Sequence, residues 1–169
     1  MEDKWTRKRV CAAIDHTLLR VDARHRDIAG FCDEAVRYGF HSVCVHPLHI
    51  AEARRRLAGS GVRAATVVDF PFGSSTSRSR VYQAMDAAME GADELDIVMP
   101  LAQALDGEWN KVEDDLSALV MAAPGCLHKI IIETGYLDDP SIKRAAMAAV
   151  NAGAAPASPA RLPCPRPRP

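Results

Sequence analysis

The chain has 169 residues, of which 48% are hydrophobic and 25% charged, and its formal net charge at pH 7 is -1. This composition is typical of one soluble globular domain, and without long runs of like charge it excludes an electrostatic basis for binding nucleic acid or a membrane surface. No apolar run approaches the roughly 20 residues that cross a bilayer. The five cysteines form an odd set without close pairing, which favours free thiols. We therefore expect a cytoplasmic protein with a small molecule as its partner.

Strand-like and helix-like segments alternate from the beginning of the chain. Residues 10–19 predict a short buried strand, and apolar residues at helical spacing over 28–36 predict a helix that stops at Gly39. A second strand is predicted over 42–46, before Pro47. Ile50, Ala53 and Leu57 mark the helix that follows. The strand–helix unit has thus repeated.

The third unit begins with a strand over 64–70 and a loop over 71–76, whose hydroxyl side chains are good N-caps for the next helix. That helix is predicted to end at Gly91. Its expected apolar face consists of Val81, Met85, Ala88 and Met89.

Two more units follow. A strand over 94–100 precedes a loop that runs through Gly107, and a strand over 129–135 comes last. The expected apolar residues of the two helices after these strands are Val112, Leu116, Leu119 and Val120, and Ile142, Ala145, Ala146, Ala149 and Val150. Five such units predict parallel strands covered by helices, either as an open doubly wound sheet or as an incomplete (β/α)8 barrel.

The composition changes at the end of the chain. Residues 154–169 contain most of the prolines and show no hydrophobic periodicity, which predicts a disordered tail. The expected organisation is one domain over 1–153 followed by this tail.

Several strands carry polar side chains. Because strand residues two apart share a face, we group them as Asp15 with Thr17, Cys44 with His46, Glu94 with Asp96, and Lys129 with Glu133. Burying an unpaired charge costs several kcal/mol, so Lys129 is the obvious counter-charge for Asp15 or Asp96. Such a cluster is either a structural ion pair or catalytic machinery. Asp96 lies near a strand end, where α/β folds bind substrates.

Two other motifs are weaker. Cys44, His46 and His49 have metal-ligating side chains, but they span a strand and a helix start, so we expect no metal there. The segment 72–75 before a helix could cradle a phosphate, although N-capping is the commoner use. Neither a dinucleotide fingerprint nor a phosphate loop is present, and no cofactor is expected.

Five strings in order resemble deoxyribose-phosphate aldolases over residues 10–153. They are IDHTLL, SVCVHP, VVDFPFGSST, GADELDIVMP and KIIIETGYL. The resemblance implies a (β/α)8 barrel that cleaves 2-deoxy-D-ribose 5-phosphate into acetaldehyde and D-glyceraldehyde 3-phosphate through a Schiff base, without metal. Asp96 matches the family's proton-relay aspartate. The positions that match the lining of its active site are Asp15, Thr17, Cys44 and Lys129.

The resemblance stops after residue 153, where the family continues into the segment with its Schiff-base lysine. No lysine follows Lys143, so the chain is expected to be an incomplete, inactive barrel. The substrate class that the resemblance implies is a small phosphorylated sugar. One alternative is a non-catalytic fragment that pairs with another chain through its open sheet edge. Another is a different enzyme that uses Asp96 and Lys129 as an acid–base pair. Homo-oligomerisation is left open by the sequence.

Overall fold

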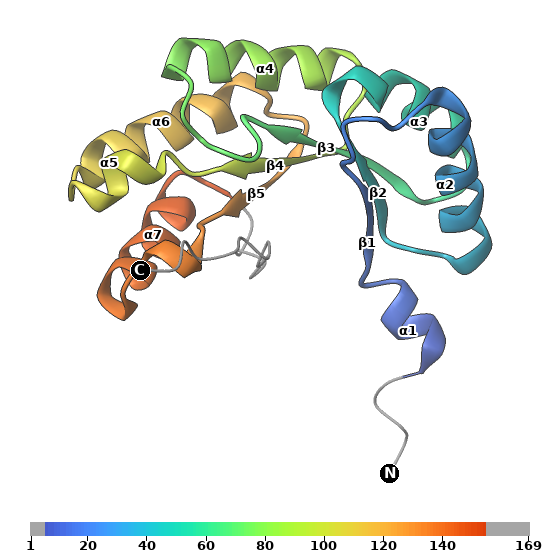
Figure 1. Ribbon diagram of the computed structural model, residues 1–169, viewed down its shortest axis with the longest axis horizontal. Coiled ribbons are helices and arrows are strands. Elements are labelled where there is room, and N and C mark those ends of the chain that lie inside the picture. Colours follow the sequence, from blue (N-terminus) through green and yellow to red (C-terminus); the bar gives the residue numbers. More distant parts are fainter. Residues whose placement is uncertain (1–5, 155–169) are drawn as a thin grey trace. The chain divides into compact units, whose positions relative to one another are not determined.

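A computed structural model of the protein describes residues 6–154. Strands and helices alternate along this part of the chain (Figure 1). The strands are Asp15–Leu18 (β1), Ser42–Val45 (β2), Arg63–Val68 (β3), Glu94–Val98 (β4) and Leu127–Ile131 (β5). The α-helices are Arg7–Cys11 (α1), His25–Tyr38 (α2), Ile50–Leu57 (α3), Ser77–Met89 (α4), Leu101–Leu105 (α5), Trp109–Ala122 (α6) and Asp139–Asn151 (α7). Two short 3-10 helices are Pro47–His49 (η1) and Thr134–Tyr136 (η2).

The strands form a parallel sheet whose spatial order follows the chain, from β1 to β5. In its register Asp15 lies opposite Ser42 and Thr17 opposite Cys44. Parallel neighbours that follow one another in sequence require a crossover helix between them, and the helices α2 to α6 fill this role. The prediction of five strand–helix units is confirmed.

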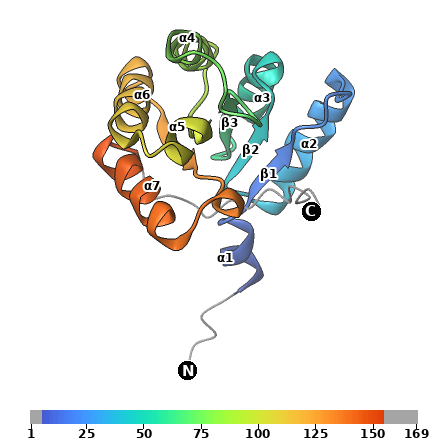
Figure 2. The same ribbon diagram turned by 60° about the vertical axis from the view of Figure 1, so that its left-hand side comes forward.

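The described residues divide into two compact units. The first comprises the residues up to Val67 together with Asp86–Leu95. In it α2 packs on β1 and β2 and contacts α3, as Figures 1 and 2 also show. The helix residues Ile28, Cys32 and Ala35 are buried because they recur on one face of α2.

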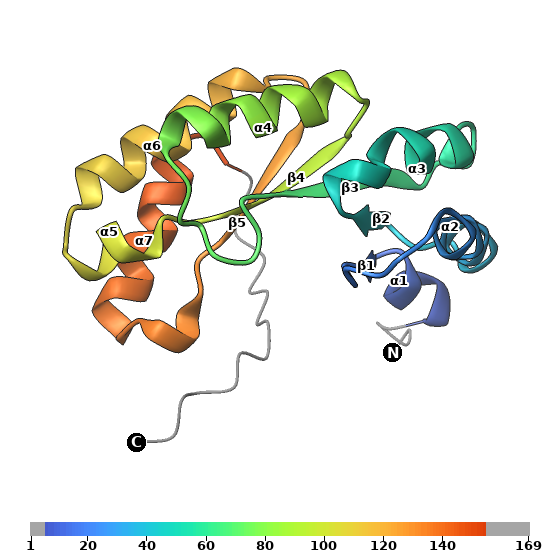
Figure 3. The same cartoon turned by 45° about the horizontal axis from the view of Figure 1, so that its top comes forward.

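The second unit comprises Val68–Met85 and the described residues from Asp96 onward. Here α6 lies beside α7 and contacts α5 (Figure 3). Leu116 and Leu119 of α6 and Ala145 and Ala149 of α7 are fully buried. The small alanine side chains allow the two helices to approach closely. Strand residues, among them Ile97, Val98 and Ile130, complete the core of the unit.

The predicted strand boundaries differ most from the observed ones at the first and last strands. The first strand was predicted from residue 10, but residues 7–11 are helical, because Thr6 Oγ1 caps the helix by accepting a hydrogen bond from the Arg9 backbone N–H. The first strand therefore begins only at Asp15. The last strand ends at Ile131, since Glu133 has a left-handed φ of 50° that does not continue a strand.

The predicted apolar face of α4 is wrong. Met85 and Met89 are 40% and 84% exposed, whereas Arg80, Ala84 and Ala87 form the buried face. The carboxylate partners of Arg80, Asp69 and Asp115, lie on segments outside α4, so helical periodicity does not register them.

Two other expectations concern features outside the sheet. In the part of the chain that the structure describes, no helix is both long and apolar enough to cross a membrane. The tail predicted over 154–169 lies, apart from its first residue, outside the described residues.

Candidate active site

Asp96 and Lys129 form an ion pair between the neighbouring strands β4 and β5, and both residues belong to the second unit. Lys129 Nζ lies 2.8 Å from Asp96 Oδ1. The two side chains are 14% and 19% exposed, so both lie mostly out of water while remaining reachable by it. Of the two counter-charges predicted for Lys129, the structure pairs it with Asp96.

The strand pattern explains why this ion pair forms. On β4 the residues that flank Asp96, Leu95 and Ile97, are fully buried, and on β5 the following residue, Ile130, is 1% exposed. Alternation turns these apolar side chains to one face and the charged pair to the other. In such surroundings each charge stabilises the charged form of the other.

The other three predicted lining residues lie in the first unit. Asp15 Oδ1 accepts a hydrogen bond of 2.6 Å from Ser42 Oγ, and Thr17 Oγ1 donates one of 2.9 Å to the Asp15 carbonyl. Cys44 is buried, at 1% exposure, and lies opposite Thr17 in the register of β1 and β2. The structure thus brings these three together on adjacent strands, and Asp96 and Lys129 together on two others.

Arg80, which sequence reasoning missed, organises the end of β4. Its guanidinium is completely buried and lies 2.5 Å from Asp115 Oδ2 and 3.5 Å from Asp69 Oδ2. It also donates to the Val98 carbonyl at the end of β4. Burial lowers the pKa of Arg80, and the carboxylates of Asp115 and Asp69 oppose that shift.

The loop between β3 and α4 packs tightly against the same strand end. A Cβ atom at Gly73 would collide with the Met99 carbonyl oxygen, and Gly73 has a φ of +59°, so both space and backbone favour glycine. Asp69, at a left-handed φ of 54°, accepts hydrogen bonds from the backbone N–H and hydroxyl of Ser75. Thr76 Oγ1 accepts from the Ser79 N–H at 3.4 Å, as expected for an N-cap of α4.

A cavity of about 530 Å³ opens beside this loop, lined in part by Ser74, Thr76, Gln103, Lys111 and Asp114. Its lining carries both signs of charge and many hydroxyl and amide groups.

The sequence did contain a signal for the ion-pair network around Arg80. Asp115 interrupts the apolar stripe of α6, and a carboxylate in that place requires a partner.

Cys44, His46 and His49 do not come together as a metal site. Cys44 is buried within β2, and His46 Nε2 lies 3.0 Å from the Leu19 carbonyl oxygen. His49 belongs to another group of side chains, with His25 and Glu52.

Taken together, the alternating strand–helix units and the mostly buried lysine–aspartate pair on adjacent parallel strands define an α/β protein with charged side chains on its strands. The sequence matches the model of the DeoC/LacD family aldolases over residues 9–158. The chain belongs to this aldolase family.

Individual relatives agree with that assignment. The chain is 43% identical over 141 residues to deoxyribose-phosphate aldolase 2 of Staphylococcus aureus, and it has the same identity to the deoxyribose-phosphate aldolase of Deinococcus radiodurans. Either alignment covers 83% of this chain and 64% of the relative. The tetrameric deoxyribose phosphate aldolase structure from Aeropyrum pernix superposes with a TM-score of 0.82 at 26% identity, over 88% of this chain and 63% of that one. The aldolase QR15 gives 0.81 at 31% identity, over 91% and 66%.

Proposed function

We propose that the chain carries the proton-transfer part of a deoxyribose-phosphate aldolase site, acting on a small phosphorylated sugar. The observation that carries the proposal is the 2.8 Å contact between Lys129 Nζ and Asp96 Oδ1 on adjacent strands. Family membership and the match to deoxyribose-phosphate aldolases support the reaction class. The chain spans 64% of the length of these relatives, so the complete reaction is inferred from them.

In the proposed mechanism Asp96 is the catalytic carboxylate. Carbon–carbon cleavage through a Schiff base requires a group that moves protons to and from the substrate, and a carboxylate near water can do this. Lys129 is a positioning residue, because its ammonium fixes the Asp96 carboxylate and keeps it ionised. The same contact keeps Lys129 protonated, and a protonated amine cannot attack a carbonyl.

The Schiff-base lysine is proposed to lie outside these 169 residues, in which no lysine follows Lys143. The 169 residues by themselves are therefore proposed to be inactive as an aldolase. Trapping with acetaldehyde and borohydride, followed by intact mass spectrometry and peptide mapping, tests this point. We expect no stoichiometric adduct beside a Staphylococcus aureus aldolase control that is trapped fully. A stoichiometric adduct on Lys129 or Lys143 would contradict it.

A hybrid protein tests the role of Asp96 directly. Residues 1–153 are joined to the C-terminal part of the Staphylococcus aureus relative that this chain does not match. We expect cleavage of 2-deoxy-D-ribose 5-phosphate, and a loss of about 100-fold or more in kcat after Asp96→Asn, as for a general acid–base group. The control is Asp86→Asn, which changes an exposed carboxylate on α4. A hybrid in which both variants keep full activity would refute the proposal.

A further inference from the structure

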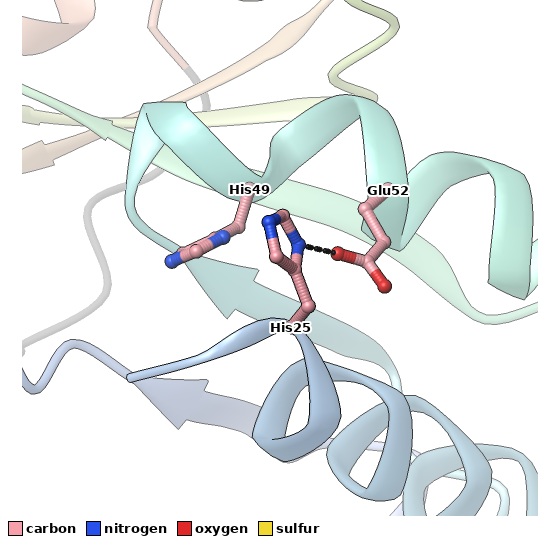
Figure 4. A group of neighbouring side chains, drawn as sticks. All are labelled: His25, His49 and Glu52. Carbon is pink, nitrogen blue, oxygen red and sulfur yellow. Dashed lines mark hydrogen bonds and ion pairs between the residues drawn. The ribbon is translucent and has the colours of Figure 1, made fainter. Parts of the chain in front are cut away.

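Three side chains with metal-ligating atoms meet on the outer side of the first unit, away from the groups used above. His25 is the first residue of α2, His49 ends η1, and Glu52 lies in the first turn of α3. One possible ligand atom from each lies within 4.8 Å of the other two. Figure 4 shows the His25 ring standing between the His49 ring and the Glu52 carboxylate, with His25 Nδ1 2.5 Å from Glu52 Oε2.

His49 supplies an independent indication of a ligand. The residue is only 6% exposed, and its Nδ1 is a buried atom without a hydrogen-bond partner. An imidazole nitrogen removed from water and left without a partner costs free energy. In Figure 4 one ring nitrogen of His49 faces His25, and the two rings meet edge to face at 5.7 Å between centroids. A cation between them would give the buried nitrogen a partner.

We propose that His25, His49 and Glu52 bind a divalent transition-metal ion, with Zn²⁺ as the best fit. Two neutral imidazoles and one carboxylate form a donor set that zinc accepts, with the remaining position filled by water. The spacing of three residues puts His49 and Glu52 on one side of the chain as it enters α3. Arg56 Nε donates to Glu52 Oε1 at 2.9 Å, which orients the carboxylate and leaves Oε2 for the ion.

The geometry needs only a local adjustment to close around an ion. Zinc–ligand distances of about 2.0–2.2 Å put two ligand atoms of a tetrahedral ion roughly 3.3–3.6 Å apart. The ligand atoms here lie within 4.8 Å of one another, and His25 Nδ1, at 2.5 Å from Glu52 Oε2, would have to draw back slightly to admit the ion. The side chain of His25 is 83% exposed, whereas that of Glu52 is 11% exposed. The exposed ring can therefore rotate onto a site whose other two ligands are already held. The ion would connect the start of α2 to the start of α3, two helices that already pack together.

Zinc titration of the full chain in competition with a chromophoric chelator tests this site. We expect one equivalent to bind, and His25→Ala and Glu52→Gln each to weaken binding by about tenfold or more, the lower range for disturbing a metal site. Because His25 is exposed, its replacement leaves the fold intact. His16→Ala is the matched control, since His16 also faces a carboxylate, at 3.1 Å from Glu34, but without a second histidine.

A second readout separates this site from other possible zinc ligands. Co²⁺ absorption in the visible range reports the coordination of the ion, and we expect it to change in His25→Ala and Glu52→Gln but not in His41→Ala, which breaks the other group of possible ligands, Asp15, His41 and Glu94. Zinc should also raise the Tm of the wild type and leave that of Glu52→Gln unchanged. Equal zinc affinity in wild type, His25→Ala and Glu52→Gln, or loss of binding only in His41→Ala, would overturn the proposal.

Discussion

Replacing Arg80 with methionine should destabilise the protein far more than the loss of an ordinary ion pair. Arg80 is completely buried and faces the carboxylates of Asp115, at 2.5 Å and 8% exposure, and Asp69, at 3.5 Å and 10% exposure. Methionine fills much of the same volume but leaves the Asp115 charge buried without its cation. Breaking a buried pair in this way costs about 3–5 kcal/mol, a large part of a typical free energy of unfolding of about 5–15 kcal/mol.

Urea denaturation followed by far-ultraviolet circular dichroism measures this cost. The double variant Arg80→Met, Asp115→Leu should recover most of it, because the Asp115 charge is then removed with its cation. The remaining carboxylate, Asp69, keeps its hydrogen bonds from Ser75. Lys111→Met is the control, since Lys111 Nζ lies 2.6 Å from Glu108 Oε1 but the side chains are 62% and 38% exposed, and such a pair contributes at most about 1 kcal/mol. A loss below about 1 kcal/mol in Arg80→Met, or a double variant no more stable than the single one, would refute this account.

Three further predictions concern stability and reactivity. Gly73→Ala should lower the free energy of unfolding, measured by urea denaturation, by more than about 1 kcal/mol, because the added Cβ atom would collide with the Met99 carbonyl oxygen. Gly107→Ala is the comparison, since Gly107 also has a positive φ but faces open space. Its replacement should cost only about 1 kcal/mol. Burial raises the pKa of the Cys32 thiol to about 11. Treatment of the native protein with iodoacetamide, followed by peptide mapping, should therefore show Cys32 unmodified and the part-exposed Cys126 modified. Modification of both at equal rates would contradict this. Burial lowers the pKa of His128, although a hydrogen bond with the Ala123 backbone opposes this shift. As the pH falls, the unfolded chain therefore takes up the proton before the folded chain does, and the free energy of unfolding decreases below about pH 6.5. Denaturation curves at several pH values should show a smaller decrease in His128→Gln.

The strand–helix units could be predicted because local signals agree with the packing. In α2 the apolar residues recur every three or four positions, and Gly39 ends the helix in the left-handed conformation, with a φ of 66°, as its position in the sequence suggests. Four of the five strands, β2 to β5, carry two or more β-branched residues, which makes them recognisable between turn residues. Boundaries were less predictable, since a single cap at Thr6 was enough to turn residues 7–11 into a helix.

The candidate site could be predicted only where a charged residue within an apolar strand requires an oppositely charged partner. Lys129 and Asp96 stand within apolar strands, and the cost of burying either alone indicates that they pair. The face of α4 was mispredicted because the partners of Arg80 lie 35 residues away at Asp115 and on strand ends, which no helical period records. The group of His25, His49 and Glu52 was not predicted for the same reason, since 27 residues separate His25 from Glu52. The sequence motif had grouped His49 with Cys44 and His46 instead.

Strand β4 carries two carboxylates, and their surroundings separate a structural ion pair from a candidate catalytic group. Glu94, at the start of the strand, is completely buried and is contacted by His41 at 2.8 Å and Arg63 at 2.9 Å. An imidazole and a guanidinium around one inaccessible carboxylate suit the fixing of strand ends, because proton exchange with a substrate would require access that Glu94 lacks. Asp96, two residues later, is 19% exposed and contacts the cation of Lys129. A carboxylate that is both oriented and reachable can exchange protons, so of the two it is Asp96 whose replacement should affect catalysis and Glu94 whose replacement should affect folding.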